Sequence, residues 1–487
     1  MIYSNQSVEK FDVFQTHMEI YPYTKGSNFQ FEKSLSTWND IKRRYEPAGY
    51  FIKNKKLYIP RGLSLDKLSS TFGVVPNTSF THDKYSSFKK YDIIIKPKDD
   101  LQLEVIDFLT SRGKFMNGNL YSQFGLHTNT GTGKTYCACN SILQMRIKTI
   151  IITHQDKIKN QWIETFKKIS DIPENELINI NGTTVMDKII EEKFDGSIYF
   201  VNHQTINNYA KINGWDGLRE FFKKTKIGIK IYDEAHKFFS NILMIDYFSN
   251  VYRTYYITAT FTRSNYMENR VFKQAFANVY KYGMETKKDM RKHVIYVPVI
   301  YNSNPSQQML TKMQTAYGFS SYAFIDYALH IDENKTLENV LLQVMSRVYN
   351  EEGKHLVVSP KIESVNILSK CLSDYFMEDV AIIHSKLDKN TDEMYENITS
   401  RRLISSTIKS LGTGVDIPGL RYLYCLEPHS SKSLTEQLVG RLREYSSDKN
   451  TVFFDFFDTG VPQMYLMYKS HMNVMKNIAV EIKEIRF

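Results

Sequence analysis

The sequence predicts an α/β protein in which two parallel-sheet domains follow a small α+β domain. From about residue 93 onward, apolar runs typical of buried strands alternate with stretches of helical periodicity. This alternation is the order in which a parallel sheet and its crossover helices occur along a chain. It stops at about residues 285–335, which are polar and less regular, and then resumes. The length of 487 residues also suits about three domains.

The domain boundaries and the strands follow from this pattern. We expect a basic accessory domain over residues 1–92, a first sheet domain over 93–290, a connection over 291–335, a second sheet domain over 336–460 and a C-terminal helix over 461–487. The strands expected in the first sheet are Lys148–Thr153, Ser197–Asn202, Ile227–Tyr232 and Thr254–Thr258. Those expected in the second are His355–Ser359, Val380–His384, Arg402–Ser406, Tyr422–Leu426 and Thr451–Phe457.

The two ends of the chain differ from this alternation. Residues 1–92 read as short strands with one or two helices, separated by turns at Pro47–Gly49, Arg61–Gly62 and Pro76–Asn77. The last segment has helical periodicity. We expect its buried stripe to consist of Met464, Met467, Tyr468, Met472 and Met475.

Composition narrows the class of protein. Apolar residues make up 42% and charged residues 24%, which is an ordinary globular balance. The net charge is +10, and residues 1–98, with 16 Lys/Arg and 9 Asp/Glu, hold +7 of it, which favours a polyanionic partner. No apolar run approaches the roughly 18–20 residues of a membrane span, and no signal peptide is visible, so we expect a soluble, cytoplasmic protein without a membrane partner. The four cysteines have no zinc spacing, and we expect Cys137 and Cys139 to be buried thiols.

A phosphate-binding loop is the strongest local signal. The run Thr128-Asn-Thr-Gly-Thr-Gly-Lys-Thr135 carries the GKT end of a Walker A loop ahead of a helix. Lys134 is expected to reach the β- and γ-phosphates of ATP, and Thr135 to offer its hydroxyl to Mg²⁺. Glycines let backbone N–H groups turn toward phosphate oxygens, and the alternative is a glycine-rich turn without a ligand. The residues expected to hold the nucleotide are Thr130, Gly131, Thr132, Gly133, Lys134 and Thr135.

A pair of carboxylates strengthens this interpretation. Asp233-Glu234-Ala235-His236 directly follows an expected buried strand. Asp233 is expected to hold Mg²⁺ through its waters, and Glu234 to orient and deprotonate the attacking water. A solvated acidic turn is the alternative, but it explains less because the pair follows the Walker loop by about 100 residues.

Further motifs, in order over about residues 92–460, resemble those of superfamily 2 helicases and translocases with two RecA-like domains. They comprise Gln102 upstream of the Walker loop, Ile151–Trp162, Asn202–Thr205, the Asp-Glu-Ala-His run, Ile257–Thr260, Leu411–Pro418 and Gln437–Arg443. The resemblance implies that Gln102 and Asp416 bind the nucleotide, that His236, Thr258, Thr260 and Gln437 couple hydrolysis to movement, and that His154, Gln155, Gln204, Thr205 and Thr413 contact DNA.

The last of these motifs implies an arginine finger from the second domain. A guanidinium there would stabilise charge on the γ-phosphate. The family usually places a second arginine three residues after the first, where this chain has Glu444, and Arg443 lies one residue early. The resemblance therefore implies that the catalytic arginine is Arg441 or Arg443, and a surface arginine pair at a helix start is the alternative.

The N-terminal region favours one group within this superfamily. Phe29–Leu63 resembles the small leading domain of phage UvsW-type helicases, which ends in a Pro-Arg-Gly turn before a helix. On strands, Lys53 and Lys55 would share one face. Basic side chains among aromatic ones suit binding to a DNA backbone, although a solvated basic face is the alternative. The residues expected to bind DNA here are Lys42, Arg43, Arg44, Lys53, Lys55, Lys56 and Arg61.

The resemblance implies an ATP- and Mg²⁺-dependent DNA helicase that remodels forks, Holliday junctions, R-loops or D-loops in phage replication and recombination. Its partners would be forked or four-way DNA and replication or recombination proteins in the host cytoplasm, and a monomer suffices for one ATP site. Three alternatives stay open: an RNA-remodelling helicase, the translocase subunit of a restriction or defence complex, and a degenerate ATPase that serves as a DNA-binding scaffold.

Overall fold

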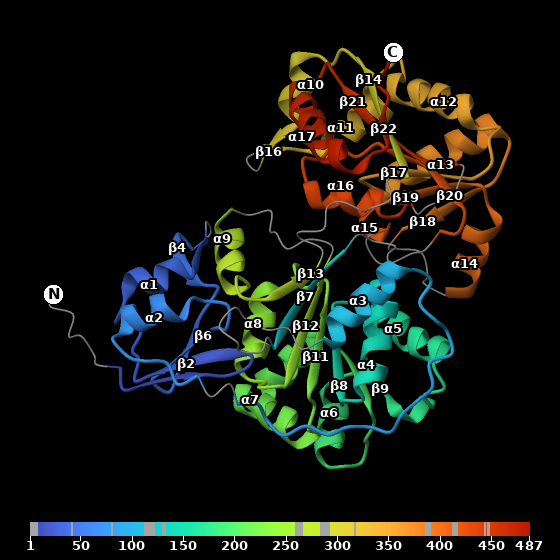
Figure 1. The fold of residues 1–487 in the computed structure, drawn as a ribbon. Coiled ribbons are helices and arrows are strands. Elements are labelled where there is room, and N and C mark those ends of the chain that lie inside the picture. The colour runs from blue at the N-terminus through green and yellow to red at the C-terminus, as the bar shows by residue number, and fades with distance from the viewer. Residues whose placement is uncertain are drawn as a thin grey trace. The chain divides into compact units, whose positions relative to one another are not determined.

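The computed structural model describes most of the chain in two compact units. The described residues are 8–39, 42–78, 81–111, 122–128, 133–258, 266–282, 293–315, 318–384, 391–411, 417–442, 445 and 449–487. The units comprise Met1–Lys288 and Asp289–Phe487 (Figure 1). Each is built around one large parallel sheet with helices, which confirms the predicted α/β class.

The first unit contains a seven-stranded sheet whose neighbouring strands are all parallel. Across the sheet the strands are β13 (Tyr280–Tyr282), β7 (Gln123–His127), β12 (Arg253–Thr258), β11 (Ile229–Asp233), β8 (Thr149–Thr153), β10 (Ile198–Asn202) and β9 (Leu177–Ile180). The larger helices are α3 (Asp100–Thr110), α4 (Lys134–Met145), α5 (Asp156–Ile169), α6 (Thr183–Ile190), α7 (His203–Thr225), α8 (Phe239–Tyr247) and α9 (Tyr266–Ala275).

Both faces of this sheet are buried, which explains why its strands could be predicted. Ile150 and Ile152 of β8 pack into one apolar cluster, and Ile151 packs into another. A strand covered on both faces is apolar throughout and stands out from its surroundings. The four strands predicted for this sheet are confirmed to within two residues, whereas β7, β9 and β13 were not predicted.

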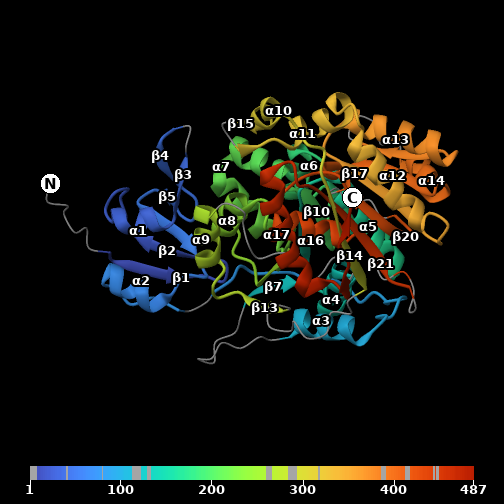
Figure 2. The ribbon, with the colours of Figure 1, turned by 90° about the horizontal axis from the view of Figure 1, so that it is seen from above.

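The N-terminal region forms a four-stranded antiparallel sheet and a separate hairpin. The sheet order is β1 (Lys10–Val13), β2 (His17–Tyr21), β6 (Lys56–Pro60) and β5 (Phe51–Lys53), the hairpin is β3 (Ser36–Asn39) with β4 (Arg44–Pro47), and the helices are α1 (Phe29–Ser34) and α2 (Leu65–Phe72). These elements lie beside α8 and α9 in both views (Figure 1, Figure 2). Met18, Ile20 and Tyr58 share one apolar cluster with Tyr247 and Phe248, so this region packs as part of the first unit.

The second unit also contains a parallel sheet. Its strands, in order, are β18 (Val380–Ile383), β19 (Leu403–Thr407), β17 (Lys354–Ser359), β20 (Leu420–Cys425), β21 (Thr451–Asp458), β14 (Val294–Tyr301) and β22 (Glu481–Ile482), with β23 (Ile485–Arg486) also paired to β14. Its helices include α10 (Gln307–Lys312), α11 (Ser321–Asp326), a π-helix (Tyr327–Ile331), α12 (Thr336–Val348), α13 (Ile362–Phe376), α14 (Thr391–Ser400), α15 (Ile408–Leu411), α16 (Lys432–Val439) and α17 (Pro462–Ile478). The five predicted strands are confirmed.

Residues 291–335 differ from the expected connection because they contribute β14 to this sheet. β14 pairs with β21 from Val294 to Tyr301. A proline inside a strand normally argues against a central position, because proline has no N–H to donate. Here Pro298 falls in the gap between the two short strands on the other side, which pair at Ile295–Tyr296 and Val299–Ile300. The strand therefore tolerates its proline.

The C-terminal segment is helical only in part. α17 ends at Ile478, and the chain then forms β22 and β23 instead of continuing as a helix. Met464, Met467 and Met475 are buried as predicted. Tyr468 and Met472 are half-buried and pack at the margins of apolar clusters. In the described part of the chain, no helix is both long and apolar enough to span a bilayer.

Candidate functional site

The predicted site residues of the first unit gather at one edge of its sheet. Asp233 and Thr258 end β11 and β12, His154 follows β8, Gln204 follows β10, and Lys134 follows the loop after β7. Because these strands are parallel, their carboxyl ends lie at the same edge. Open α/β sheets bind ligands outside this edge.

The predicted phosphate loop lies between β7 and the first turn of α4. Gly133 has φ +82° and caps the helix, a left-handed conformation that glycine adopts without strain. Lys134 Nζ donates a hydrogen bond to the carbonyl oxygen of Thr128, at 2.8 Å. Burial lowers the pKa of Lys134 to about 8, although Glu234 and Asp233 act in the opposite direction. A strand, a loop and a helix N-terminus of this kind suit an anion. The predicted contacts Thr130, Gly131 and Thr132 lie outside the described residues.

Gln102 lies directly against this loop. It is buried in α3, and a Cβ atom at Gly133 would lie 2.5 Å from its Nε2. Its Oε1 accepts a hydrogen bond from the backbone N–H of Lys98, at 3.0 Å. The side chain is therefore held in one orientation beside the start of α4, and Gly133 is the residue that leaves room for it.

The carboxylates follow β11. Asp233 Oδ2 accepts a hydrogen bond from Trp162 Nε1 at 2.9 Å, and its Oδ1 accepts one from the backbone N–H of Glu234 at 2.9 Å. Burial and the charge of Glu234 raise the pKa of Asp233 to about 6. Among the described residues, buried Glu234 Oε2 accepts no hydrogen bond, and His236 Nδ1 lies 3.2 Å from it. The carboxylates of Asp233 and Glu234 and the hydroxyl of Thr135, in the first turn of α4, are hard oxygen donors of the kind that fits Mg²⁺ and a water.

Two residues predicted to couple hydrolysis to movement are in contact. His236 Nδ1 and Thr258 Oγ1 lie 2.8 Å apart, and both side chains are buried. The backbone N–H of Ala235 also donates to the carbonyl oxygen of Ile257, at 3.1 Å. The ends of β11 and β12 are thereby joined next to Glu234. Thr260 lies outside the described residues.

A polar hollow of about 430 Å³ lies farther along the same sheet edge, near β9 and β10. Its lining includes the predicted contacts Gln204 and Thr205, together with Asp156, Lys159, Asn181 and Asn202. Asn202 Nδ2 donates to Asp156 Oδ1 at 2.8 Å, and Lys159 Nζ lies 2.8 Å from the same oxygen. Amide and ammonium groups of this kind suit a phosphodiester backbone. We refer to this feature as the polar hollow.

His154 and Gln155 lie between the carboxylates and the polar hollow. The His154 ring packs near Phe238, with centroids 6.0 Å apart, and its Nε2 lies 3.4 Å from Lys237 Nζ. Burial lowers the pKa of His154 to about 4, so its imidazole is neutral at pH 7. Gln155 is half-buried and directly precedes α5.

The cations predicted to bind DNA in the N-terminal region fall into two groups. Lys42, Arg43, Arg44 and Lys55 are exposed, and Lys42 and Arg44 pair with Glu46 only at the surface. Lys53 Nζ lies 2.6 Å from Asp216 of α7, which is also exposed. In contrast, Lys56 Nζ lies 2.7 Å from buried Glu19. Arg61 is buried, and burial lowers its pKa to about 10.

The expectation that Lys53 and Lys55 share a strand face is wrong. Asn54 and Lys55, with φ of 50° and 57°, form the two-residue turn of the hairpin between β5 and β6. Two consecutive positive φ angles match a type I′ turn, whose twist suits a tight hairpin. Lys55 therefore projects from a turn instead of a strand.

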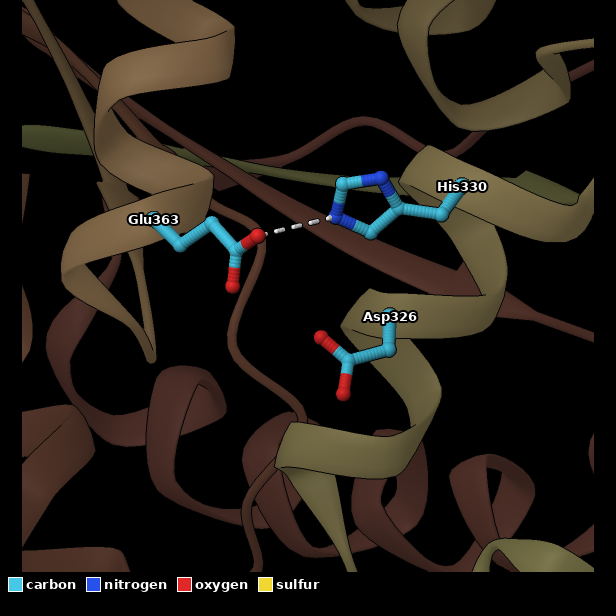
Figure 3. Close-up of side chains that lie close together, drawn as sticks. All are labelled: Asp326, His330 and Glu363. Atoms are coloured by element: carbon cyan, nitrogen blue, oxygen red, sulfur yellow. Dashed lines mark ion pairs between the residues drawn. The ribbon is translucent and has the colours of Figure 1, made fainter.

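In the second unit, Gln437 lies in α16 and Arg441 follows it, with its backbone N–H bonded to the carbonyl oxygen of Leu438. Thr413, Asp416 and Arg443 lie outside the described residues. Elsewhere in this unit, His330 Nε2 lies 3.7 Å from Glu363 Oε1, and Asp326 is close to both (Figure 3). Because Lys361 already pairs with Asp326 and all three groups are substantially exposed, we interpret these contacts as surface ion pairs.

The sequence did not reveal the hydrogen bond between Trp162 and Asp233. Trp162 lies on the buried face of α5 with Ile158, Phe166 and Ile169. The only sequence signal was an indole N–H at a position whose helical neighbours are apolar, since a buried tryptophan usually finds an acceptor.

Comparisons with known proteins agree with this fold. The family model described as type III restriction enzyme, res subunit (ResIII), matches residues 98–263. The structure of S. cerevisiae Dbp5 bound to RNA and ADP BeF3 has a TM-score of 0.53 at 13% identity and covers 79% of this chain and 89% of its own. The chain has a superfamily 2 helicase-like fold. The type ISP restriction-modification enzyme LlaBIII bound to DNA has a TM-score of 0.52 at 13% identity, over 86% of this chain and 34% of its own.

Similar sequences come from poxviruses. The transcript termination protein A18 of camelpox virus (strain CMS) is 22% identical over 480 residues, which are 95% of this chain and 91% of that protein. The match includes the N-terminal region and both units. The narrower resemblance to phage UvsW-type helicases stays a prediction.

Proposed function

We propose that this protein is an ATP-hydrolysing helicase or translocase that remodels branched DNA. The observation that carries the proposal is the convergence of Lys134, Asp233 and Glu234 at one sheet edge, with His236 and Thr258 joined beside them. The polar hollow at the same edge supports an interaction with a nucleic-acid strand.

The roles of the residues follow from their positions. Lys134 exchanges its hydrogen bond to the Thr128 carbonyl for phosphate oxygens, and the N-terminus of α4 adds its dipole. Glu234, whose Oε2 has no hydrogen-bond donor among the described residues, orients the attacking water and takes its proton. Mg²⁺, held by Thr135 and Asp233, would neutralise phosphate charge. Arg441, with Arg443 as the alternative, is the proposed arginine finger.

The relatives favour a second candidate substrate. They are named transcript termination proteins, and removal of a transcript from its template requires displacement of an RNA strand from DNA. An R-loop presents the same chemistry, with an RNA–DNA hybrid next to a displaced strand. We therefore include R-loops with forks and four-way junctions as proposed substrates.

Strand displacement tests this proposal. Labelled four-way junctions, forks and R-loops are incubated with protein, Mg²⁺ and ATP, and the products are separated by electrophoresis. We expect ATP-dependent conversion of at least one branched substrate, and no conversion by the Lys134→Ala variant. The control is Lys211→Ala, which changes an exposed lysine of α7. ATP-dependent activity on RNA duplexes alone would replace the DNA proposal with the RNA-remodelling alternative.

A further inference from the structure

α5 connects the polar hollow to the candidate catalytic carboxylates. Its first turn supplies Asp156 and Lys159 to the lining of the hollow. One turn later, Trp162 is 1% exposed and its Nε1 donates to Asp233 Oδ2 at 2.9 Å. One rigid helix thus carries groups at both places.

Among the described residues, two donors orient Asp233. The backbone N–H of Glu234 holds Oδ1, and the Trp162 indole holds Oδ2. The backbone donor belongs to the next residue in the chain and moves with Asp233. The indole is therefore the group that fixes the carboxylate relative to the rest of the sheet edge. A hydrogen bond to a buried charged group is among the stronger ones in proteins.

The first turn of α5 is held in place by the other residues that line the polar hollow. Lys159 is buried, lies 2.8 Å from Asp156 Oδ1, and donates to Asn181 Oδ1. Asn202 bridges Asp156 and Thr153, with both hydrogen bonds at 2.8 Å. A phosphodiester or base that entered the hollow would compete for these same groups and would displace the first turn of α5.

We propose that Trp162 is a positioning residue that fixes the Asp233 carboxylate and links occupancy of the polar hollow by a nucleic-acid strand to ATP hydrolysis. This inference rests on the proposed function, because it assigns Asp233 to the nucleotide site and the hollow to the strand. It predicts a defect that depends on Mg²⁺ and on nucleic acid, which a loss of packing alone would not produce.

The Trp162→Phe variant removes the N–H and keeps most of the buried ring. The first measurement is the affinity for a fluorescent ATP analogue by polarisation over a Mg²⁺ titration. We expect the Mg²⁺ concentration for half-maximal binding to rise about tenfold or more, the range expected for losing a hydrogen bond to a charged group. Affinity without Mg²⁺ should be unchanged. The matched control is Trp215→Phe, in which the altered ring stacks on Phe248 with centroids 5.5 Å apart.

A double-mutant cycle tests whether Trp162 acts through Asp233. Asp233→Asn alone should raise the Mg²⁺ requirement, and adding Trp162→Phe should change it little further. If the two substitutions each raised the Mg²⁺ requirement and their factors multiplied in the double variant, the proposal would be overturned. If Trp162→Phe does not fold, as judged by circular dichroism, benzothienylalanine at position 162 replaces the N–H by sulfur at nearly constant shape.

The second measurement is the stimulation of ATP hydrolysis by nucleic acid. Trp162→Phe should lose most of the stimulation while retaining more of the unstimulated rate. Wild-type stimulation in this variant, or an unchanged Mg²⁺ requirement, would overturn the inference. If no nucleic acid stimulates the wild-type protein, the proposed function fails and so does the link to the hollow, while the Mg²⁺ titration still decides whether Trp162 positions Asp233.

Discussion

Lys230 Nζ lies 2.5 Å from Asp246 Oδ1, and both side chains are buried. Lys230 belongs to β11, the strand that ends in Asp233. Tyr232 and Tyr256 also donate hydrogen bonds to Asp246, at 2.8 and 2.6 Å. The pair joins β11 to α8, against which the N-terminal region packs. It therefore supports both the site and the docking of that region.

Breaking this pair should destabilise the first unit strongly. Lys230→Met leaves Asp246 as an uncompensated buried charge, and we expect a decrease of about 3–5 kcal/mol in the free energy of unfolding. Urea titration followed by fluorescence measures it. The control is Lys148→Met, whose partner Asp195 is exposed, and a decrease within about 1 kcal/mol is expected there. Equal decreases in the two variants would contradict this interpretation.

Glu19 should make stability depend on pH in the acid range. Burial alone would raise its pKa, but the hydrogen bonds from His17 and Lys56 outweigh burial and lower the pKa to about 2. A lowered folded-state pKa adds stability that is present above the unfolded value of about 4.5 and is lost as the pH falls toward 2. Thermal unfolding from pH 7 to pH 3 should show a steeper decline for the wild type than for Glu19→Gln. Parallel curves would exclude a contribution from Glu19.

Gly133 should not tolerate a side chain. Gly133→Ala combines a positive φ with a Cβ atom 2.5 Å from Gln102 Nε2, so we expect nucleotide affinity to fall strongly. Adding Gln102→Ala to Gly133→Ala removes the steric conflict but leaves the backbone strain. If the main role of Gln102 is to pack against the loop, the double variant should regain only part of the lost nucleotide affinity. Binding of a fluorescent ATP analogue measures both variants. Unchanged affinity in Gly133→Ala would contradict the described loop geometry.

The exposed cations of the N-terminal region should determine the salt dependence of DNA binding. The test variant replaces four exposed cations by glutamine: Lys42, Arg43, Arg44 and Lys55. The slope of log affinity against log salt concentration should become shallower by about 0.9 for each DNA phosphate that the variant no longer neutralises. Lys56→Gln serves as the contrast, because Lys56 already pairs with buried Glu19. A larger slope change in Lys56→Gln would reverse this assignment.

The sequence was most informative at positions where the structure requires a particular type of residue. A buried strand such as β8 must be apolar on both faces, so it could be recognised from the sequence alone. The phosphate loop before Lys134 stays a prediction, because most of it lies outside the described residues. β14 was missed because the stretch that contains it is polar and less regular overall. The position of Pro298 in this strand depends on where two C-terminal strands pair, which the sequence does not show. The partners of Lys53 and Lys56 were missed because Asp216 and Glu19 are distant in sequence, and spacing carries no information about such contacts.

The central claim is that the carboxylate and lysine cluster hydrolyses ATP in response to branched DNA. Steady-state ATP hydrolysis with single-stranded DNA, blunt duplex, forks, four-way junctions, R-loops and the RNA equivalents tests it most directly, with Lys134→Ala and Glu234→Gln as inactive variants. We predict strong stimulation by forked, four-way or R-loop substrates and loss of turnover in both variants. Stimulation by RNA alone, or retained turnover in Lys134→Ala, would contradict the account.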